Sequence, residues 1–143
     1  ELGQVEGTDT YRDIERNDDA HGIPGLLIYR IDDELFFANA AFFARDVKAR
    51  LIAADPPAQA LIIATEGVSD IDTTAIQELD DLLQDLREAG LTVTFARVRR
   101  PVLDMLERAG VLERHGRSAI YLEVDDAVAA YRSQHRNDDG TEA

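Results

Sequence analysis

Residues 60–64, Ala-Leu-Ile-Ile-Ala, form an unbroken apolar run in a strongly charged chain. A strand with one face in water alternates apolar and polar side chains, so a short continuous run indicates a strand buried on both faces. Helices must then cover both sides of the sheet that contains it. The run predicts an α/β fold, a small mixed, mostly parallel sheet with helices packed on it and joined by right-handed crossovers.

The segment after this run predicts a helix over residues 73–89 that ends at Gly90, since its apolar side chains recur at helical spacing. The apolar stripe consists of Ile76, Leu79, Leu82, Leu83, Leu86 and Ala89. Residues 91–98 then alternate apolar and threonine side chains, which predicts a strand.

The last third of the chain repeats the pattern. Pro101 is well placed in the first turn of a helix that ends at Gly110. Its apolar set is Val102, Leu103, Met105, Leu106 and Ala109. Residues 119–124 predict a short strand, and Asp125 is expected to cap a final helix that contains Val128 and Tyr131.

The region before the apolar run predicts a hairpin, with strands at 26–31 and 35–38 and a turn at Asp32 and Asp33. Asn39 is expected to cap the helix that follows, and the proline pair in residues 54–59 to end it. The inner face of that helix is predicted to carry Phe43, Val47, Arg50 and Leu51.

The two ends of the chain are polar. Residues 2–7 predict a short strand or extended arm, and residues 15–25 a loop rich in turn formers. The predicted organisation is an arm and loop over residues 1–22, one domain over residues 23–136 and a disordered tail over residues 137–143. Because the chain begins at Glu1 and its only methionine is Met105, we expect it to be cut from a longer protein.

Composition excludes several classes of function. The chain has no cysteine, so it has no disulfide and no thiolate metal site. Its three histidines, His21, His115 and His135, lack the spacing of a metal site. The net charge of −14 disfavours nucleic acid and anionic membrane surfaces as partners. No apolar run approaches the roughly 18 residues of a membrane span.

Motifs for catalysis are also missing. No glycine-rich nucleotide loop and no GxSxG elbow occurs in the sequence. We therefore expect no cofactor, no metal and no catalytic residues.

The stretch that begins the helix at residue 73 carries two neighbouring hydroxyls, Thr73 and Thr74, after Asp70 and Asp72. One interpretation is structural: Thr74 begins a capping box with Gln77, or Asp72 caps the helix one register earlier. The other is functional, because a phosphate added here would lie at a helix N-terminus. The nearby carboxylates would make that phosphate act mainly by repulsion.

Two charged groups are candidate contact sites. Residues 69–86 hold six acidic residues and no Lys or Arg, which favours a docking face on the helix. Its members would be Glu78, Asp80, Asp81 and Asp85. The basic residues Arg97, Arg99 and Arg100 are a candidate anion-facing cluster, with salt bridges to the acidic surface as the alternative.

The stretch Ser69–Ala75, S-x-I-D-T-T-A after a predicted strand, resembles the signature of STAS domains, found in anti-sigma-factor antagonists and in the tails of SulP anion transporters. Residues 2–20 and 23–43 resemble the arm, opening hairpin and first helix of the transporter branch, and the likeness extends to about residue 133. In the antagonists the kinase target follows the aspartate, and Thr73 takes that position here. Threonine and alanine at these positions favour the transporter branch.

The resemblance implies a STAS-like sandwich and a non-catalytic function. The chain would be the cytoplasmic regulatory and interaction domain of a SulP-type transporter of sulfate, bicarbonate or dicarboxylate, at the plasma membrane. Its partners would be the transmembrane domain of the same transporter, a second copy in a homodimer, and a regulatory protein or nucleotide. The alternative is a free-standing phosphoswitch with Thr73 as acceptor. An α/β enzyme remains a third class, which would require a tightly bound ligand.

Overall fold

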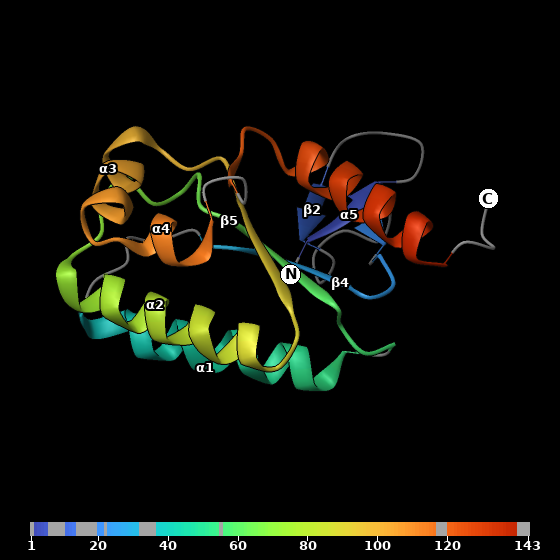
Figure 1. The fold of residues 1–143 in the computed structure, drawn as a ribbon, viewed down its shortest axis with the longest axis horizontal. Coiled ribbons are helices and arrows are strands. Elements are labelled where there is room, and N and C mark those ends of the chain that lie inside the picture. Colours follow the sequence, from blue (N-terminus) through green and yellow to red (C-terminus); the bar gives the residue numbers. More distant parts are fainter. Residues whose placement is uncertain are drawn as a thin grey trace.

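The computed structural model describes residues 2–5, 11–13, 20–21, 23–31, 37–54, 56–116 and 120–139. Its main sheet has four strands in the order β4-β5-β6-β7 (Figure 1). These are β4 (Leu26–Arg30), β5 (Ala60–Ala64), β6 (Thr92–Ala96) and β7 (Ile120–Tyr121), and each pairs in parallel with the next. The predicted α/β class and the strand at residues 60–64 are confirmed.

Helices cover both faces of this sheet. The helices α1 (Phe37–Ala53) and α2 (Thr73–Glu88) lie side by side on one face, and α5 (Val124–Asp139) lies on the other (Figure 1). Two shorter helices, α3 (Arg100–Arg108) and α4 (Val111–His115), pack on the same core cluster as α1 and α2. None of the helices in the described segments is long and apolar enough to cross a bilayer.

The central strand β5 divides the core into two parts. All five of its residues are buried. Leu61 and Ile63 face the cluster built by α1 to α4, whereas Ala60, Ile62 and Ala64 face α5. The absence of polar residues in this strand thus follows from its helix-covered position on both sides.

The helix over residues 73–89 also forms with the predicted stripe, because five of its six members are buried in α2. The exception is Ala89, which is the exposed C-cap. The helix from Pro101 and the strands at 91–98 and 119–124 are found as α3, β6 and β7. The helix α4 was not predicted, since five residues are too few to show a period.

The N-terminal region holds a second sheet that the sequence predicts only in part. Its strands β1 (Leu2–Val5), β2 (Tyr11–Asp13) and β3 (Ala20–His21) are antiparallel, in the order β2-β1-β3. The expected strand at residues 2–7 corresponds to β1. The loop expected over residues 15–25 contains β3, which forms by pairing with β1.

The expected hairpin is wrong where the structure describes it. The strand β4 pairs in parallel with β5, and Phe37 and Ala38 belong to α1. The remainder of the expected turn and second strand lies outside the described residues. Phe37 and Ala38 begin the helix that buries Phe43 and Val47 in the core cluster.

The caps predicted for α1 and α5 are also wrong. Asn39 is the third residue of α1, and Asp125 is the second residue of α5, so neither precedes its helix. The helix α5 includes Asn137–Asp139, which the sequence assigns to a disordered tail, and residues 140–143 lie outside the described segments.

Candidate functional site

The carboxyl ends of β5, β6 and β7 meet at one edge of the sheet because these strands are parallel. The segments that leave this edge are residues 65–72, 97–99 and 122–123. Binding sites in open α/β sheets are usually built on such segments. This edge also carries the predicted switch residues and the basic cluster, so we describe it as the candidate site.

The segment after β5 is anchored by its apolar residues. Val68 and Ile71 are buried with 0% and 3% exposure, and the backbone N–H of Thr65 donates to the carbonyl of Ala96 on β6 at 3.1 Å. Between these anchors Ser69 and Asp70 are exposed, and the Asp70 carboxylate accepts the N–H of Ile71 at 2.9 Å. The segment is therefore held at its base and open at its tip.

Asp72 is the N-cap of α2. Its backbone is extended, and its carboxylate accepts the N–H of Ala75 at 2.7 Å. The capping box proposed for Thr74 is wrong, and the alternative cap one register earlier is confirmed. Thr73 and Thr74 are the first two residues of the helix and are exposed, so capping does not explain these two hydroxyls.

Arg97 joins the three segments. Its Nε lies 2.7 Å from the Glu66 carboxylate after β5, and its Nη1 lies 2.6 Å from the Glu123 carboxylate after β7. Its backbone N–H donates to the carbonyl of Tyr121 at 3.1 Å. The hydrogen bond to Glu123 and the charge of Glu66 raise the pKa of Arg97. A φ of +58° places this residue in the left-handed region, which is uncommon for a side chain without a special role.

The other two basic residues also have partners in the protein. The Nε of Arg99 donates to the carbonyl of Glu66 at 2.7 Å, and the Nε of Arg100 lies 3.2 Å from Asp104 in the next turn of α3. The geometry therefore supports the salt-bridge alternative for this cluster. Arg97 pairs with Glu66 and Glu123, and Arg100 pairs with Asp104, so these two residues are engaged within the protein.

The predicted docking face on α2 is also changed by the structure. Asp80 is only 19% exposed and lies against α4, where Arg114 and His115 approach it at 3.0 and 2.8 Å. Asp85 pairs with Lys48 of α1 at 2.7 Å. The premise of unpaired carboxylates is thus wrong for Asp80 and Asp85.

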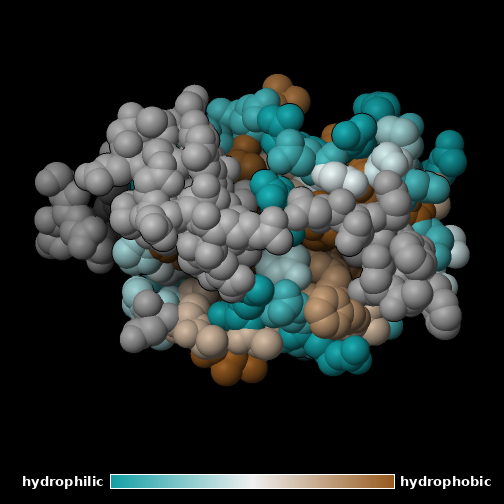
Figure 2. All heavy atoms as spheres, turned by 180° about the vertical axis from the view of Figure 1, so that it is seen from behind, coloured by the Kyte–Doolittle hydropathy of each residue, from teal (hydrophilic) through white to brown (hydrophobic). Residues whose placement is uncertain are grey.

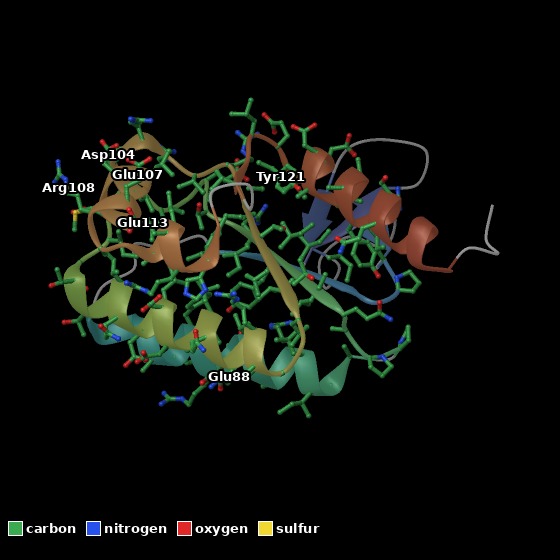
Figure 3. The ribbon with its side chains drawn as sticks, viewed as in Figure 1. Glu88, Asp104, Glu107, Arg108, Glu113 and Tyr121 are labelled. Atoms are coloured by element: carbon green, nitrogen blue, oxygen red, sulfur yellow. The ribbon has the colours of Figure 1, made fainter. Side chains whose placement is uncertain are left out.

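Two members of that face remain on the surface side of α2. Asp81 is exposed and accepts a hydrogen bond from Gln77 at 2.9 Å, while Glu78 is half-buried. Other charges gather at the end of the molecule formed by α3 and α4, where Asp104, Glu107, Arg108 and Glu113 point outward (Figure 3). A docking role for α2 stays a prediction for Asp81 and Glu78.

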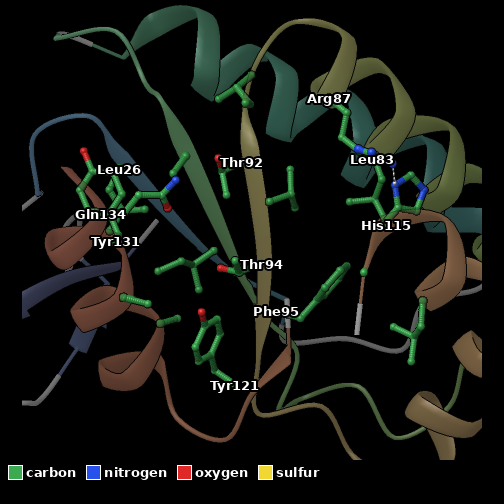
Figure 4. Close-up of a pocket in the computed structure, with 18 of the residues that line it drawn as sticks. Leu26, Leu83, Arg87, Thr92, Thr94, Phe95, His115, Tyr121, Tyr131 and Gln134 are labelled. Carbon is green, nitrogen blue, oxygen red and sulfur yellow. Dashed lines mark hydrogen bonds between the residues drawn. The ribbon is translucent and has the colours of Figure 1, made fainter. Parts of the chain in front are cut away.

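A groove of about 370 Å³ lies along β6, where the sequence predicted no site. Among the described residues β7 pairs with Phe95 and Ala96, and residues of α4 and α5 line the groove beside the first part of β6. Arg87 and His115 lie on one side of β6, and Tyr121, Tyr131 and Gln134 lie on the other (Figure 4). The walls of the groove are mainly apolar.

In the part of the chain that the structure describes, no three His, Asp or Glu side chains come together as a metal site needs. The one buried hydroxyl among the described residues, Thr65, is 4% exposed and its Oγ1 has no hydrogen-bond partner there.

Comparison with known proteins agrees with the fold. The STAS domain family matches residues 17–127. The chain is 33% identical over 133 residues to a probable sulfate transporter of Mycobacterium tuberculosis, and the match covers 92% of this chain and 23% of the transporter. The chain spans only 21% to 23% of the length of the first curated relatives it matches.

Two solved structures are similar. The murine Solute Carrier 26 family member A9 anion transporter, in the inward-facing state, matches 92% of this chain with a TM-score of 0.85 and 27% identity, over 22% of its own length. The STAS domain of a SulP transporter from Vibrio cholerae matches 86% of this chain and 93% of its own, with a TM-score of 0.67 and 22% identity.

Proposed function

The chain belongs to the STAS domain family, and from this membership we propose that it is the cytoplasmic regulatory and interaction domain of a SulP-type anion transporter, without catalytic activity. The observation that carries the proposal is the 33% identity to a probable sulfate transporter over 92% of this chain. The family match identifies the chain as a STAS domain, and the role within a transporter is our inference from that match.

Several features support a regulatory role. The predicted switch residues Asp70, Thr73 and Thr74 are exposed beside the N-terminus of α2. Through Glu66, the same segment is tied by Arg97 to the residue that precedes α5. A partner that contacts residues 65–72 would thus affect α2 on one face of the sheet and α5 on the other.

The partner in this proposal is a transmembrane unit of the same transporter. The match to the murine anion transporter supports this, because it covers 92% of this chain but only 22% of the transporter. The location would be the cytoplasmic side of the plasma membrane, and the transported anion would be sulfate, bicarbonate or a dicarboxylate.

A domain exchange tests the proposal. This chain would replace the matched segment of the Mycobacterium tuberculosis transporter in cells without their own sulfate uptake, and uptake of labelled sulfate would be measured. We expect more uptake than with the transporter truncated before that segment. The control carries an unrelated folded domain of similar length. Equal membrane expression with no gain over either comparison would contradict the proposal.

The second candidate is the phosphoswitch, favoured by one observation. Because Asp72 makes the cap, the exposed Thr73 is available for modification. The carboxylates of Asp70 and Asp72 beside it oppose a phosphate. We expect an anti-sigma kinase with ATP to leave Thr73 unmodified, by mass spectrometry. Stoichiometric phosphate that is lost in Thr73→Ala would favour the phosphoswitch instead.

A further inference from the structure

The groove along β6 has the size and the walls of a small-molecule site. Its volume of about 370 Å³ lies within the range of about 300–1,000 Å³ that ligand pockets occupy. Leu91, Val93 and Leu112 line it on the side of α2 and α4, and Ala127 and Tyr131 of α5 line it on the other. At about 30 Å³ for each water-sized group, this volume holds about twelve non-hydrogen atoms.

The apolar side chains on the outer surface are arranged differently. The large hydrophobic residues exposed in the described segments, Phe42, Ile52 and Leu122, stand out from the surface. Figure 2 shows the side of the molecule opposite to that of Figure 1, where brown atoms occur in small groups with teal atoms beside them. The groove, in contrast, encloses a volume between apolar walls, as a binding site for an apolar molecule requires.

No acidic side chain lines the groove in the part of the chain that the structure describes. This is unusual in a chain with 29 Asp and Glu among its 143 residues. Two carboxylates of α2 near these walls have other partners. Glu88 accepts a hydrogen bond from Gln84 at 3.0 Å, and Asp80 pairs with Arg114 and His115. The groove thus leaves room for a negatively charged group of a ligand.

Arg87 is the one Arg or Lys side chain among the described residues that line the groove. Its Nη1 donates to the carbonyl of Arg114 at 2.6 Å and lies 3.2 Å from Nδ1 of His115 (Figure 4). Both contacts use the same nitrogen, and within the described segments Nε and Nη2 have no partner. The N–H groups of Nε and Nη2 are parallel and match the two oxygens of one carboxylate. The contacts of Nη1 therefore hold the guanidinium while its other edge stays available.

We propose that the groove binds an organic monocarboxylate whose apolar body brings it to about twelve non-hydrogen atoms. The carboxylate pairs with Nε and Nη2 of Arg87, and the apolar body lies between α4 and α5 along β6. One guanidinium matches one carboxylate, whereas a ligand with several negative charges would need more cations. This inference goes beyond the proposed function and does not depend on it.

Amide nitrogen–proton correlation NMR of the full 143-residue chain tests the proposal. Sodium decanoate is the chain-shaped probe and sodium 2-naphthoate the ring-shaped probe. We expect a Kd of about 0.1–1 mM for at least one of them, with shifted amide signals in residues 91–95 and 111–116. At pH 7 the uncharged 2-naphthol, which has the same rings, should bind about tenfold more weakly than 2-naphthoate.

A substitution at Arg87 tests the role of its charge. Arg87→Gln should weaken binding of the carboxylate probes about tenfold and leave the affinity for 2-naphthol unchanged. The matched control is Arg108→Gln, since Arg108 points outward at the end of the molecule formed by α3 and α4 (Figure 3). That control should change neither affinity. The spread of the amide signals shows whether each variant is folded.

Neighbouring alanines of α5 test the position of the apolar body. Ala130 lines the groove and is half-buried, whereas Ala129 is exposed and does not line it. Ala130→Phe should abolish binding of the carboxylates and of 2-naphthol alike, because the new ring fills the groove. Ala129→Phe should bind all of them as wild type does.

Four results would overturn the proposal. They are no shift of the groove amides with either carboxylate at up to about 5 mM, equal affinity for 2-naphthoate and 2-naphthol, equal effects of Arg87→Gln and Arg108→Gln, and equal binding by Ala130→Phe and Ala129→Phe. Sodium sulfate that shifts the same amides as strongly would assign the groove to small inorganic anions instead. Binding of decanoate alone or of 2-naphthoate alone would support the proposal and show whether the body is a chain or a ring.

Discussion

Asp80 of α2 and His115 of α4 form a hydrogen bond of 2.8 Å between the carboxylate and Nε2. The other ring nitrogen, Nδ1, lies 3.2 Å from Nη1 of Arg87. Because a guanidinium only donates hydrogen bonds, Nδ1 of His115 is the acceptor for Arg87. The Nε2–H group of His115 then donates a hydrogen bond to the Asp80 carboxylate. The His115 side chain is 8% exposed, so this contact fixes the short helix α4 on α2.

Asp80→Ala should destabilise the domain by about 1–3 kcal/mol, because it leaves the His115 donor without its acceptor. The matched control is Asp81→Ala, which removes an exposed carboxylate of the next residue and should cost less than about 0.5 kcal/mol. Urea denaturation followed by circular dichroism gives both values. Equal effects of the two substitutions would contradict the role assigned to Asp80.

Acid stability should depend on the same carboxylate. Burial raises the pKa of Asp80, but hydrogen bonds from His115 and Arg114 and the charge of Arg114 outweigh it, so the pKa lies below its ordinary value of 3.8. The stability that this contributes is present above the unfolded-state pKa and is lost as the pH falls through the folded-state pKa. Hence the free energy of unfolding, measured by urea denaturation, should fall less steeply below about pH 4 in Asp80→Asn than in wild type.

A backbone effect is expected at Arg97. Arg97→Ala loses both ion pairs and keeps a side chain at a φ of +58°, whereas Arg97→Gly loses the same pairs but adopts this φ without strain. The glycine variant should therefore be the more stable of the two by about 1 kcal/mol. Thermal unfolding measures the difference. An alanine variant at least as stable as the glycine variant would show that the left-handed backbone carries no strain.

Gly25 and Gly90 separate steric conflict from backbone strain. Both have a positive φ, +80° and +85°, but a Cβ at Gly25 would lie 2.5 Å from the hydroxyl of Tyr131, and a Cβ at Gly90 would meet nothing within 4 Å. That hydroxyl donates to the carbonyl of Pro24 at 2.9 Å and ties α5 to the start of β4. Gly25→Ala should thus cost about 1–3 kcal/mol more than Gly90→Ala in urea denaturation. Equal costs would mean that Tyr131 moves aside freely.

Local patterns in the sequence predict most of the main sheet and its helices. The run at residues 60–64 and the stripe of α2 could be recognised because burial on two faces or one face imposes a period on neighbouring residues. The two-residue strand β3 and the five-residue helix α4 carry too little pattern to be recognised. The two-residue strand β7 lies within the strand predicted over residues 119–124.

The charge partners of α2 could not be predicted in the same way. Asp80 bonds a residue 35 positions away and Asp85 one that is 37 positions away, so both look unpaired within residues 69–86. Asn39 and Asp125 are not caps, because α1 begins two residues before Asn39 and α5 begins one residue before Asp125. Asp72 and Thr74 were the two candidate caps of α2, and the structure has Asp72 as the N-cap with an extended backbone.

The Arg97 bridge also has a mechanical consequence. One guanidinium spans from the loop that leads to α2 across to the residue that leads to α5, so it links the two layers of helices at this edge of the sheet. Withdrawal of Glu66 would leave the guanidinium of Arg97 paired with Glu123. A change at Glu66 would thus affect the contact next to α5 without a movement of the buried strand β5.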